Sequence, residues 1–334
     1  MSAAGGRTRA PTERLRVAVL EGGRSLERQV SLRTGARVQD ALERLGHESV
    51  AIDAGRDLVS RLRSADVDVA FVAMHGRDGE NGTIQELLEA IGMPHTGSRG
   101  AACLRCSDKI LAKHLMREAG IPTPDFHPFS ETAFKELGAA AALPDIEQRL
   151  GFPLVVKPAS QGSALGIKFA AASTDVPSAL VAAFSYDRRI LLERYVRGRD
   201  LAVSVLDSAD GGEPQALPVV EAVPREEDFY DFEARYEIGR TTFVCPAALP
   251  EAVTARAQQL ALQVYRLLGC QGFARVDLML AQEHEELFVL ETNAVPGLTE
   301  TSLLPQAADA AGIGFDQLVG QILASALSAG AQNV

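Results

Sequence analysis

The sequence has 334 residues, which at about 150 residues per domain is enough for two or three domains and excludes a single small module. Its formal net charge of −11 gives no general attraction for nucleic acid or an anionic membrane, so any bound anion must be met by cations at one local site. A hydrophobic content of 46% with 23% charged residues is ordinary for a globular protein and argues against intrinsic disorder.

The sequence shows neither a candidate membrane span nor an export signal within its first fifteen residues. No stretch approaches the roughly 20 uncharged apolar residues of a membrane span, and residues 1–15 lack an apolar segment. We therefore expect a cytoplasmic protein with a disordered tail at residues 1–15 and with neither a membrane nor a nucleic-acid partner. Cys103 and Cys106 form a C-x-x-C motif without a second pair, so we expect reduced structural thiols rather than a zinc site.

The first hundred residues alternate apolar strands with helices. The expected elements are a strand at 16–20, a helix ending near 45, a strand at 49–52, a short helix at 58–62 and a strand at 67–74. This alternation predicts a parallel sheet covered by helices. Open sheets of this class bind ligands at the carboxyl ends of their strands, where two polar, glycine-rich loops lie at 21–31 and 75–83.

The pattern changes at about residue 107 and predicts a small α+β lobe. Its expected elements are helices at 108–119, 134–142 and 176–185 and strands at 153–158, 167–171 and 189–196.

The last third predicts a further set of strands. They are expected at 201–206, 216–219, around 243–244, 273–280 and 286–293, with a helix at 250–268 and another at the C-terminus. Residues 222–242 show neither helical nor strand periodicity. A structureless stretch of this length inside a compact domain is typical of a lid or binding loop.

Three oxygen-bearing side chains lie on the two strands expected to form a hairpin. Glu291 and Asn293 are two residues apart and share one face of a strand, and pairing brings Asp277 beside them. Oxygen ligands of this kind suit Mg²⁺, which is usually held by one or two carboxylates together with substrate phosphates. The alternative is a solvated sheet face, which we disfavour because two adjacent exposed acids repel each other.

Phosphate binding is the second chemical signal. Lys157 ends an apolar strand and precedes the turn Gly162–Gly166, whose backbone amides are suited to bend over phosphates. The turn matches neither the GxxxxGK[ST] nor the GxGxxG pattern, and taken alone it is as often a simple hairpin turn. His75 and Glu27 lie in the two glycine-rich loops; their ordinary roles would be a structural hydrogen bond and a charge at a helix N-terminus.

Eight motifs, taken in order, resemble the D-alanine–D-alanine ligase family of the ATP-grasp superfamily. They are EGGRSLERQVSLRTG, AMHGRDGENGTIQELLEAIGMPHTGS, SDK, VVKPASQGSALG, LLERYVRGRD, FYDFEARY, GFARVDLML and ETNAVPGLTETSLLP. The resemblance covers the chain from residue 16 to about 323. It implies an α/β ATP-grasp fold with a Rossmann-like N-terminal substrate-binding domain at 16–100, a central lobe at 101–193 and a C-terminal lobe at 194–330 that carries the metal site and the lid.

The implied activity is the ATP-dependent joining of two D-alanines through an acyl phosphate, for peptidoglycan synthesis. In such a reaction catalysis is mostly positioning and charge neutralisation. The implied small molecules are ATP, D-alanine and Mg²⁺, with two ions expected and Mn²⁺ as a substitute. The family resemblance also implies a homodimer.

The resemblance assigns roles to individual residues. Catalytic roles fall to Glu27, Ser163, Arg275, Tyr236 and His75; ATP binding to Lys109, Lys157, Gly162, Ser163, Glu193, Tyr195, Val196, Asp200 and Arg235; substrate binding to Glu27, His75, Gly297, Ser302 and Leu303; and metal binding to Asp277, Glu291 and Asn293. Among these, Glu27 is expected to hold the ammonium of the first D-alanine, with Ser163 and Tyr236 as its hydrogen-bond partners.

Three positions depart from the family pattern. Arg235 stands where a lysine is usual, Ala164 where a second serine is usual, and Ala294 where a threonine is usual. Arginine and lysine are not equivalent at a phosphate. These departures motivate an alternative hypothesis, a degenerate protein that senses nucleotide or D-amino acids. A further alternative is a ligase that joins D-alanine to another D-amino acid, although Tyr236 favours D-alanine over D-lactate as acceptor.

Overall fold

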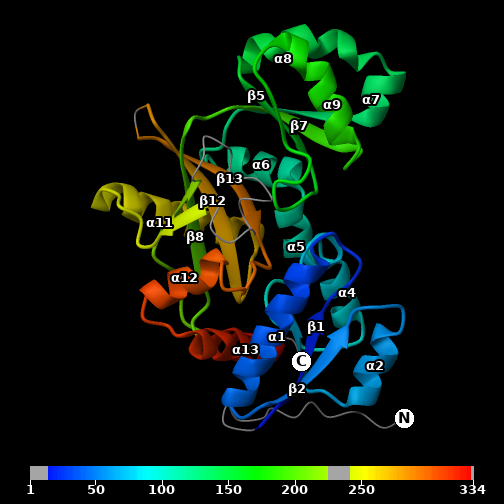
Figure 1. The fold of residues 1–334 in the computed structure, drawn as a ribbon, viewed down its shortest axis with the longest axis vertical. Coiled ribbons are helices and arrows are strands. Elements are labelled where there is room, and N and C mark those ends of the chain that lie inside the picture. The colour runs from blue at the N-terminus through cyan, green and yellow to red at the C-terminus, as the bar shows by residue number, and fades with distance from the viewer. Residues whose placement is uncertain (1–13, 225–240, 284, 332–334) are drawn as a thin grey trace.

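The computed structural model describes residues 14–224, 241–283 and 285–331 (Figure 1). Its N-terminal part contains a parallel sheet in the order β2-β1-β3, as the alternating pattern predicted. The strands are β1 (Arg16–Glu21), β2 (Glu48–Asp53) and β3 (Val69–Val72), and they are accompanied by α1 (Arg28–Arg44) and α2 (Leu58–Ala65). All four residues of β3 are buried, because helices cover a sheet of this class on both faces.

Four helices connect this sheet to the central lobe. They are α3 (Arg77–Glu80), α4 (Thr83–Ala90), α5 (Gly100–Ser107) and α6 (Lys109–Glu118). Only α6 was predicted. It begins where expected because Asp108 caps it: the carboxylate accepts a hydrogen bond from the backbone N–H of Leu111 at 3.0 Å.

The central lobe is an antiparallel sheet in the order β4-β7-β5-β6, flanked by helices, which confirms the predicted α+β lobe. Its strands are β4 (Phe126–Ser130), β5 (Leu154–Pro158), β6 (Lys168–Ala170) and β7 (Arg189–Arg194), and its helices are α7 (Glu131–Glu136), α8 (Leu143–Leu150), α9 (Val176–Phe184) and the short 3₁₀ helices η1 (Ala139–Ala142) and η2 (Ser173–Asp175). The single helix predicted at 134–142 is wrong: Gly138, with φ 69°, separates α7 from η1.

The third sheet runs in the order β11-β10-β8-β12-β13, with β9 paired to β8. Its elements are β8 (Gly198–Leu206), β9 (Gln215–Ala216), β10 (Val220–Pro224), β11 (Thr241–Val244), β12 (Phe273–Ala281), β13 (Leu287–Asn293), α11 (Glu251–Leu268), α12 (Leu303–Ala310) and α13 (Phe315–Ala331). The predicted pairing of the strands that carry Asp277 and Glu291 is confirmed. The expected C-terminal helix is confirmed as α13, and α12, which was not predicted, precedes it at an angle of 106°.

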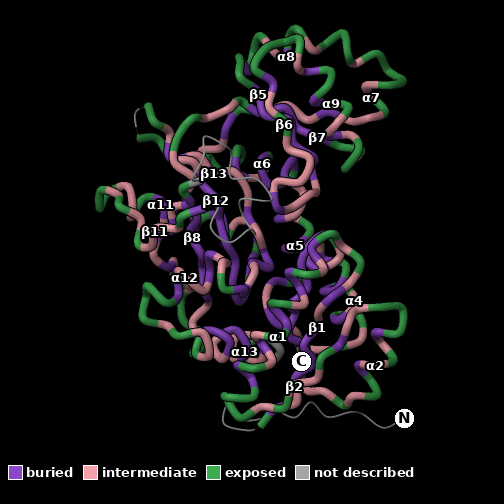
Figure 2. Tube along the Cα trace, viewed as in Figure 1, coloured by how far each residue is buried: buried purple, intermediate pink, exposed green. Residues whose placement is uncertain are grey.

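The N-terminal and C-terminal parts share their apolar cores, whereas the central lobe has its own. Figure 2 shows buried stretches both in the central lobe and in the rest of the chain. One shared cluster joins Leu20 of β1 to Val203 of β8, and a second joins Val19 to Leu318 of α13. In the central lobe, Ile146, Leu154 and other apolar side chains form a separate cluster. The predicted domain boundaries, at 100/101 and 193/194, stay a prediction.

No single helix in the described part of the chain is long and apolar enough to cross a membrane. Taken together, the bent pair of helices α12 and α13 is long and apolar enough by length and composition alone. Leu304, Leu318 and Ile322 of this pair are fully buried in the second shared core, which accounts for its apolar character.

Candidate active site

Two cavities meet between the three sheets. The first is lined by polar and charged residues, among them His75, Glu80, Lys109, Gly162, Ser163, Arg275, Glu291, Asn293, Gly297 and Ser302. The second is lined by both apolar and charged residues, among them Lys157, Ala164, Phe169, Glu193, Tyr195, Val196, Asp200, Asp277 and Met279. Glu291 and Leu303 line both cavities. The residues predicted to bind metal therefore lie where the two cavities meet.

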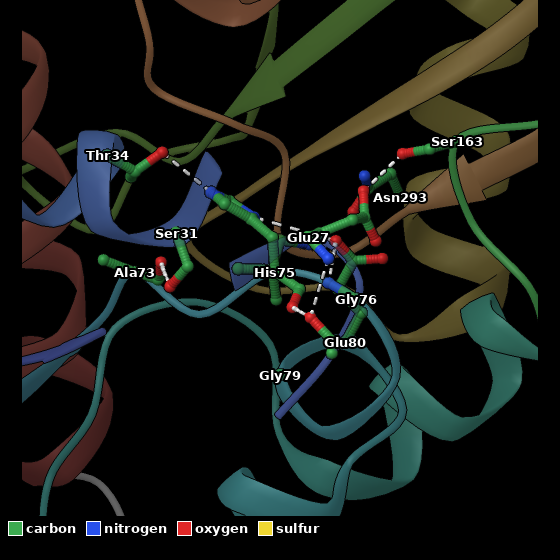
Figure 3. Close-up of polar contacts among 12 residues, drawn as sticks. Glu27, Ser31, Thr34, Ala73, His75, Gly76, Gly79, Glu80, Ser163 and Asn293 are labelled. Carbon is green, nitrogen blue, oxygen red and sulfur yellow. Dashed lines mark hydrogen bonds and ion pairs between the residues drawn. The ribbon is translucent and has the colours of Figure 1, made fainter. Parts of the chain in front are cut away.

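The glycine turn of the central lobe, which lines the first cavity, contacts the residue that precedes helix α1. Glu27 immediately precedes α1 and is 4% exposed, and the hydroxyl of Ser163 donates a hydrogen bond to its carboxylate (Figure 3). The two residues are 136 positions apart in sequence. The structure therefore brings together two of the residues that the resemblance placed at the first D-alanine.

His75 is buried and held between two polar side chains. Its Nε2 lies 2.9 Å from the hydroxyl of Thr34, and its Nδ1 lies 3.7 Å from a carboxylate oxygen of Glu80 (Figure 3). The same oxygen accepts a hydrogen bond from the N–H of Gly76 at 3.2 Å. Sequence reasoning missed Thr34 and Glu80, although Glu80 lies in the same loop motif as His75.

The turn after β5 has an unusual backbone. Ser163 and Ala164 have φ values of 53° and 58°, in the left-handed region that residues with a side chain rarely adopt. The Nζ of Lys109 donates a hydrogen bond to the carbonyl of Gln161 at 2.6 Å, which ties this turn to the start of α6. Backbone strain of this kind clusters at ligand-binding loops.

The acidic residues of β12 and β13 lie opposite one another. Asp277 is in register with Glu291, and Arg275 with Asn293, and a β-bulge follows Asp277. Both oxygens of Asp277 accept hydrogen bonds from Arg275, at 2.6 and 2.8 Å. The carboxylate of Glu291 lies 3.1 Å from the Nζ of Lys109. The junction thus holds two carboxylates, an amide and two cations.

A buried ionic cluster contributes to the wall of the second cavity. Glu193 is 1% exposed; one of its oxygens pairs with Lys157 and the other lies 2.7 Å from the Nζ of Lys113. Burial acts to raise the pKa of Glu193, but the two ammonium groups outweigh it and the pKa is lowered. Burial also lowers the pKa of Lys113, to about 8. Sequence reasoning missed Lys113, which lies one helical turn after Lys109.

The remaining residues assigned to the ATP site fall around the second cavity. Tyr195 packs edge-to-face against Phe169, with 5.7 Å between ring centroids, and Val196 and Asp200 line the same space. Arg235 and Tyr236 lie outside the described residues.

The loop between β13 and α12 carries the residues assigned to the second D-alanine. The hydroxyl of Ser302 accepts a hydrogen bond from the N–H of Thr299 at 3.0 Å, and Leu303 begins α12. Gly297 lies against this hydroxyl: a Cβ there would stand 2.7 Å from it. A side chain at Gly297 would therefore displace Ser302.

The three cysteines near the first cavity do not form a metal centre. Cys106 and Cys270 lie with their sulfurs 3.5 Å apart, and Cys103 donates to the carbonyl of Ser98 at 3.4 Å. Burial raises the pKa of the Cys103 thiol. Within the described ranges, no group of three or more His, Cys, Asp or Glu side chains is arranged to hold a metal ion.

Comparison with known proteins agrees with this geometry. The family model for the D-ala D-ala ligase C-terminus matches residues 115–324, and the N-terminus model matches residues 55–98. The chain belongs to the D-alanine–D-alanine ligase family. The D-alanine--D-alanine ligases of Syntrophotalea carbinolica and Moorella thermoacetica are both 42% identical to it, covering 95% and 94% of this chain and 98% and 99% of those proteins.

A solved structure supports the same assignment at the level of the fold. The crystal structure of the D-alanine--D-alanine ligase from Bacillus anthracis complexed with ATP has a TM-score of 0.80 and 31% identity, covering 96% of this chain and 99% of that one. The resemblance seen in the sequence is therefore confirmed, together with the ATP-grasp fold and the enzyme class, an ATP-dependent ligase.

Proposed function

We propose that this site joins two D-alanines to D-alanyl-D-alanine at the expense of ATP, for peptidoglycan synthesis. The observation that supports this most directly is the junction of the two cavities at Glu291 and Leu303. A nucleotide in the second cavity and an amino acid in the first would meet there, beside Arg275 and Lys109. The family assignment indicates the substrates, since the related proteins are D-alanine--D-alanine ligases.

A carboxylate is a poor electrophile, so the reaction needs activation. A carboxylate oxygen of the first D-alanine attacks the γ-phosphorus of ATP, which gives an acyl phosphate and ADP. The amine of the second D-alanine then attacks the acyl carbon, and inorganic phosphate leaves with that oxygen. The site contributes mainly by positioning the reactants and neutralising their charge.

The first D-alanine would bind between α1 and the turn after β5. Glu27 would accept hydrogen bonds from its ammonium, with Ser163 holding the carboxylate of Glu27 in place. His75, fixed by Thr34 and Glu80, would face the substrate, and Arg275 would stabilise negative charge on the transferring phosphoryl group. Tyr236, outside the described residues, completes the proposed set.

ATP would lie in the second cavity. Lys109 and Lys157 would hold its phosphates, under the turn that contains Gly162 and Ser163. The backbone of the strand from Glu193 to Val196 would meet the base, and Asp200 would lie near the ribose. Arg235 of the lid is proposed to contact phosphate in place of the usual lysine.

Asp277, Glu291 and Asn293 have the chemistry that Mg²⁺ requires. Two carboxylates directly opposite in register, with an amide two residues on, present hard oxygen donors at the cavity junction. We propose that they hold Mg²⁺, two ions in the full complex, with Mn²⁺ as a substitute. The metal would neutralise charge on the phosphate oxygens.

Acceptor choice, assembly and location complete the proposal. Gly297, Ser302 and Leu303 would receive the carboxylate of the second D-alanine, at the N-terminus of α12. The acceptor could instead be another D-amino acid, which product analysis over a series of D-amino acids distinguishes. We also propose a homodimer in the cytoplasm, which sedimentation and cell fractionation measure.

The substitution Glu291→Gln tests the proposed metal site. It keeps the shape of the side chain but removes a charge from the cavity junction, so turnover should fall by about a hundredfold or more. Glu286→Gln is the matched control, because Glu286 lies exposed on the same β12–β13 hairpin. Circular dichroism should show both variants folded. Wild-type kcat in Glu291→Gln would contradict the assignment.

A further inference from the structure

Arg37 is a cation that none of the roles above uses. Its Nη1 donates a hydrogen bond to the carbonyl of Leu298 at 2.5 Å, and its Nε lies 3.2 Å from the carboxylate of Glu300. The guanidinium also stacks over the ring of Phe315, 4.0 Å from the ring centroid. One side chain of α1 therefore makes three contacts with the C-terminal part of the chain, two of them with the loop between Gly297 and Ser302.

The position of Arg37 on α1 relates this loop to the first substrate. Thr34 and Arg37 are three residues apart and therefore share one face of the helix. Thr34 contacts His75, whereas Arg37 contacts the loop after β13. The His75 Nε2 lies only 4.0 Å from where a Cβ on Gly297 would stand. The imidazole that Thr34 contacts and the loop that Arg37 contacts are therefore neighbours. A single rigid helix thus positions groups on both sides of the first cavity.

We propose that Arg37 is a positioning residue for the acceptor pocket, holding the loop of residues 297–302 in the conformation that receives the carboxylate of the second D-alanine. The identity of the substrate in this proposal rests on the proposed function. The proposal that Arg37 fixes the conformation of the loop rests only on the contacts of Arg37.

The chemistry of arginine explains why this residue suits the task. A planar guanidinium can donate to a carbonyl and to a carboxylate in two directions while its face lies on an aromatic ring. The ion pair with Glu300 is a minor part of the hold, because that carboxylate is 68% exposed and screened by solvent. The hydrogen bond to the carbonyl of Leu298 contributes more to holding the loop. Leu298 is a buried residue of the loop itself, so a bond to its backbone fixes the loop directly.

Hydrogen–deuterium exchange tests the hold without reference to activity. In Arg37→Met, the backbone amides of Thr299 and Ser302, which are hydrogen-bonded within the loop, should exchange about tenfold faster than in the wild type. Arg44→Met is the matched control: Arg44 lies on the same helix and pairs with Asp316, next to Phe315, but does not touch the loop. It should leave exchange in the loop unchanged.

Steady-state kinetics test the consequence for the acceptor. Initial rates over a range of D-alanine concentrations, fitted with separate donor and acceptor sites, should show an acceptor KM raised about tenfold in Arg37→Met. The donor KM and the KM for ATP should change less than twofold. Arg37→Lys should raise the acceptor KM less, because an ammonium group keeps the charge but not the several donors of the planar guanidinium. Glu300→Gln should behave as the wild type.

The outcomes separate the two proposals. If the wild type forms no dipeptide, the proposed function fails, while the exchange measurement still decides whether Arg37 holds the loop. Equal exchange and equal acceptor KM in Arg37→Met and Arg44→Met would overturn the proposal, as would donor and acceptor KM values that rise together. If Arg37→Met does not fold, an unchanged acceptor KM in Arg37→Lys would overturn it.

Discussion

The polar side chains around the first cavity are held in place by one another. Ser163 fixes Glu27, Thr34 and Glu80 fix His75, and Arg275 is aligned by both oxygens of Asp277. Groups fixed in this way do not have to reorganise when charge develops in the reaction. The site is therefore preorganised at the level of single side chains.

The residue that carries the clearest pH dependence is Asp53. Its bidentate hydrogen bond with Arg28 lowers the pKa of Asp53 to about 2, and the same carboxylate accepts a hydrogen bond from the N–H of Gly23 at 3.1 Å. Because the pKa is lower in the folded state, this contact stabilises the protein above about pH 4. The stabilisation is lost as the pH falls towards 2.

Asp53→Asn should therefore lower the free energy of unfolding at pH 7, by less than about 1 kcal/mol because the pair is nearly half exposed. Urea unfolding at pH 7, 4.5 and 3 measures the difference between the variant and the wild type. The difference should shrink as the pH falls; a difference that stayed constant over this range would show that the charge is not its cause.

For single residues, the sequence was informative where a role follows from the spacing along neighbouring strands. It was not informative where a role depends on residues that are distant in the sequence. Asp277, Glu291 and Asn293 follow from strand periodicity, and the structure brings them together. Thr34 and Lys113 carry no local signal. Thr34 is an ordinary helix residue until the fold places His75, 41 positions away, against it, and Lys113 becomes notable only beside Glu193.

Helix α6 and strand β7 are joined by the buried pair of Lys113 and Glu193, and α6 is joined in turn to β13. Lys113 also donates to the hydroxyl of Thr123, which donates to the carbonyl of Val289 at 2.8 Å. The central lobe and the strand that carries Glu291 are thus connected through one ammonium group.

Lys113→Met should lower the free energy of unfolding by about 2 kcal/mol, because one oxygen of the buried Glu193 carboxylate loses its cation while Lys157 still pairs with the other. Lys135→Met is the control: its pair with Glu131 on α7 is screened by solvent, so its loss should lower the free energy of unfolding much less. Urea unfolding of both variants checks this. Equal losses would show that the buried pair contributes no more than the exposed one.

The elements that sequence reasoning missed are short ones. Helices α4 and α5 have eight residues each and are separated by a loop, so neither offers enough turns for a clear periodicity. Helix α8 follows an alanine run that gave no apolar stripe of its own. By contrast, α1 and α11, with 17 and 18 residues, were predicted nearly to their ends.

At the scale of the whole molecule, the central lobe differs from the other two parts in its core. The N-terminal and C-terminal parts share two apolar clusters, whereas the central lobe has a core of its own. A unit with a separate core and a polar cavity at its edge is expected to shift relative to its neighbours when that cavity is filled.

ATP should therefore stabilise the whole molecule. At a hundred times its dissociation constant, ATP with Mg²⁺ contributes about 2.7 kcal/mol, which corresponds to a rise in Tm of about 5 °C. Calorimetry with and without ATP and Mg²⁺ measures the shift. Glu291→Gln should lose the part that depends on Mg²⁺, and Glu286→Gln should keep it; no shift in the wild type would contradict nucleotide binding in this site.

The most direct test of the central claim follows an oxygen atom. With D-alanine labelled with ¹⁸O in its carboxyl group, ATP and Mg²⁺, the acyl-phosphate route transfers one labelled oxygen to inorganic phosphate for each D-alanyl-D-alanine formed. We predict equal amounts of ADP, labelled phosphate and dipeptide by mass spectrometry. Dipeptide with unlabelled phosphate, or ATP consumption without dipeptide, would contradict the account.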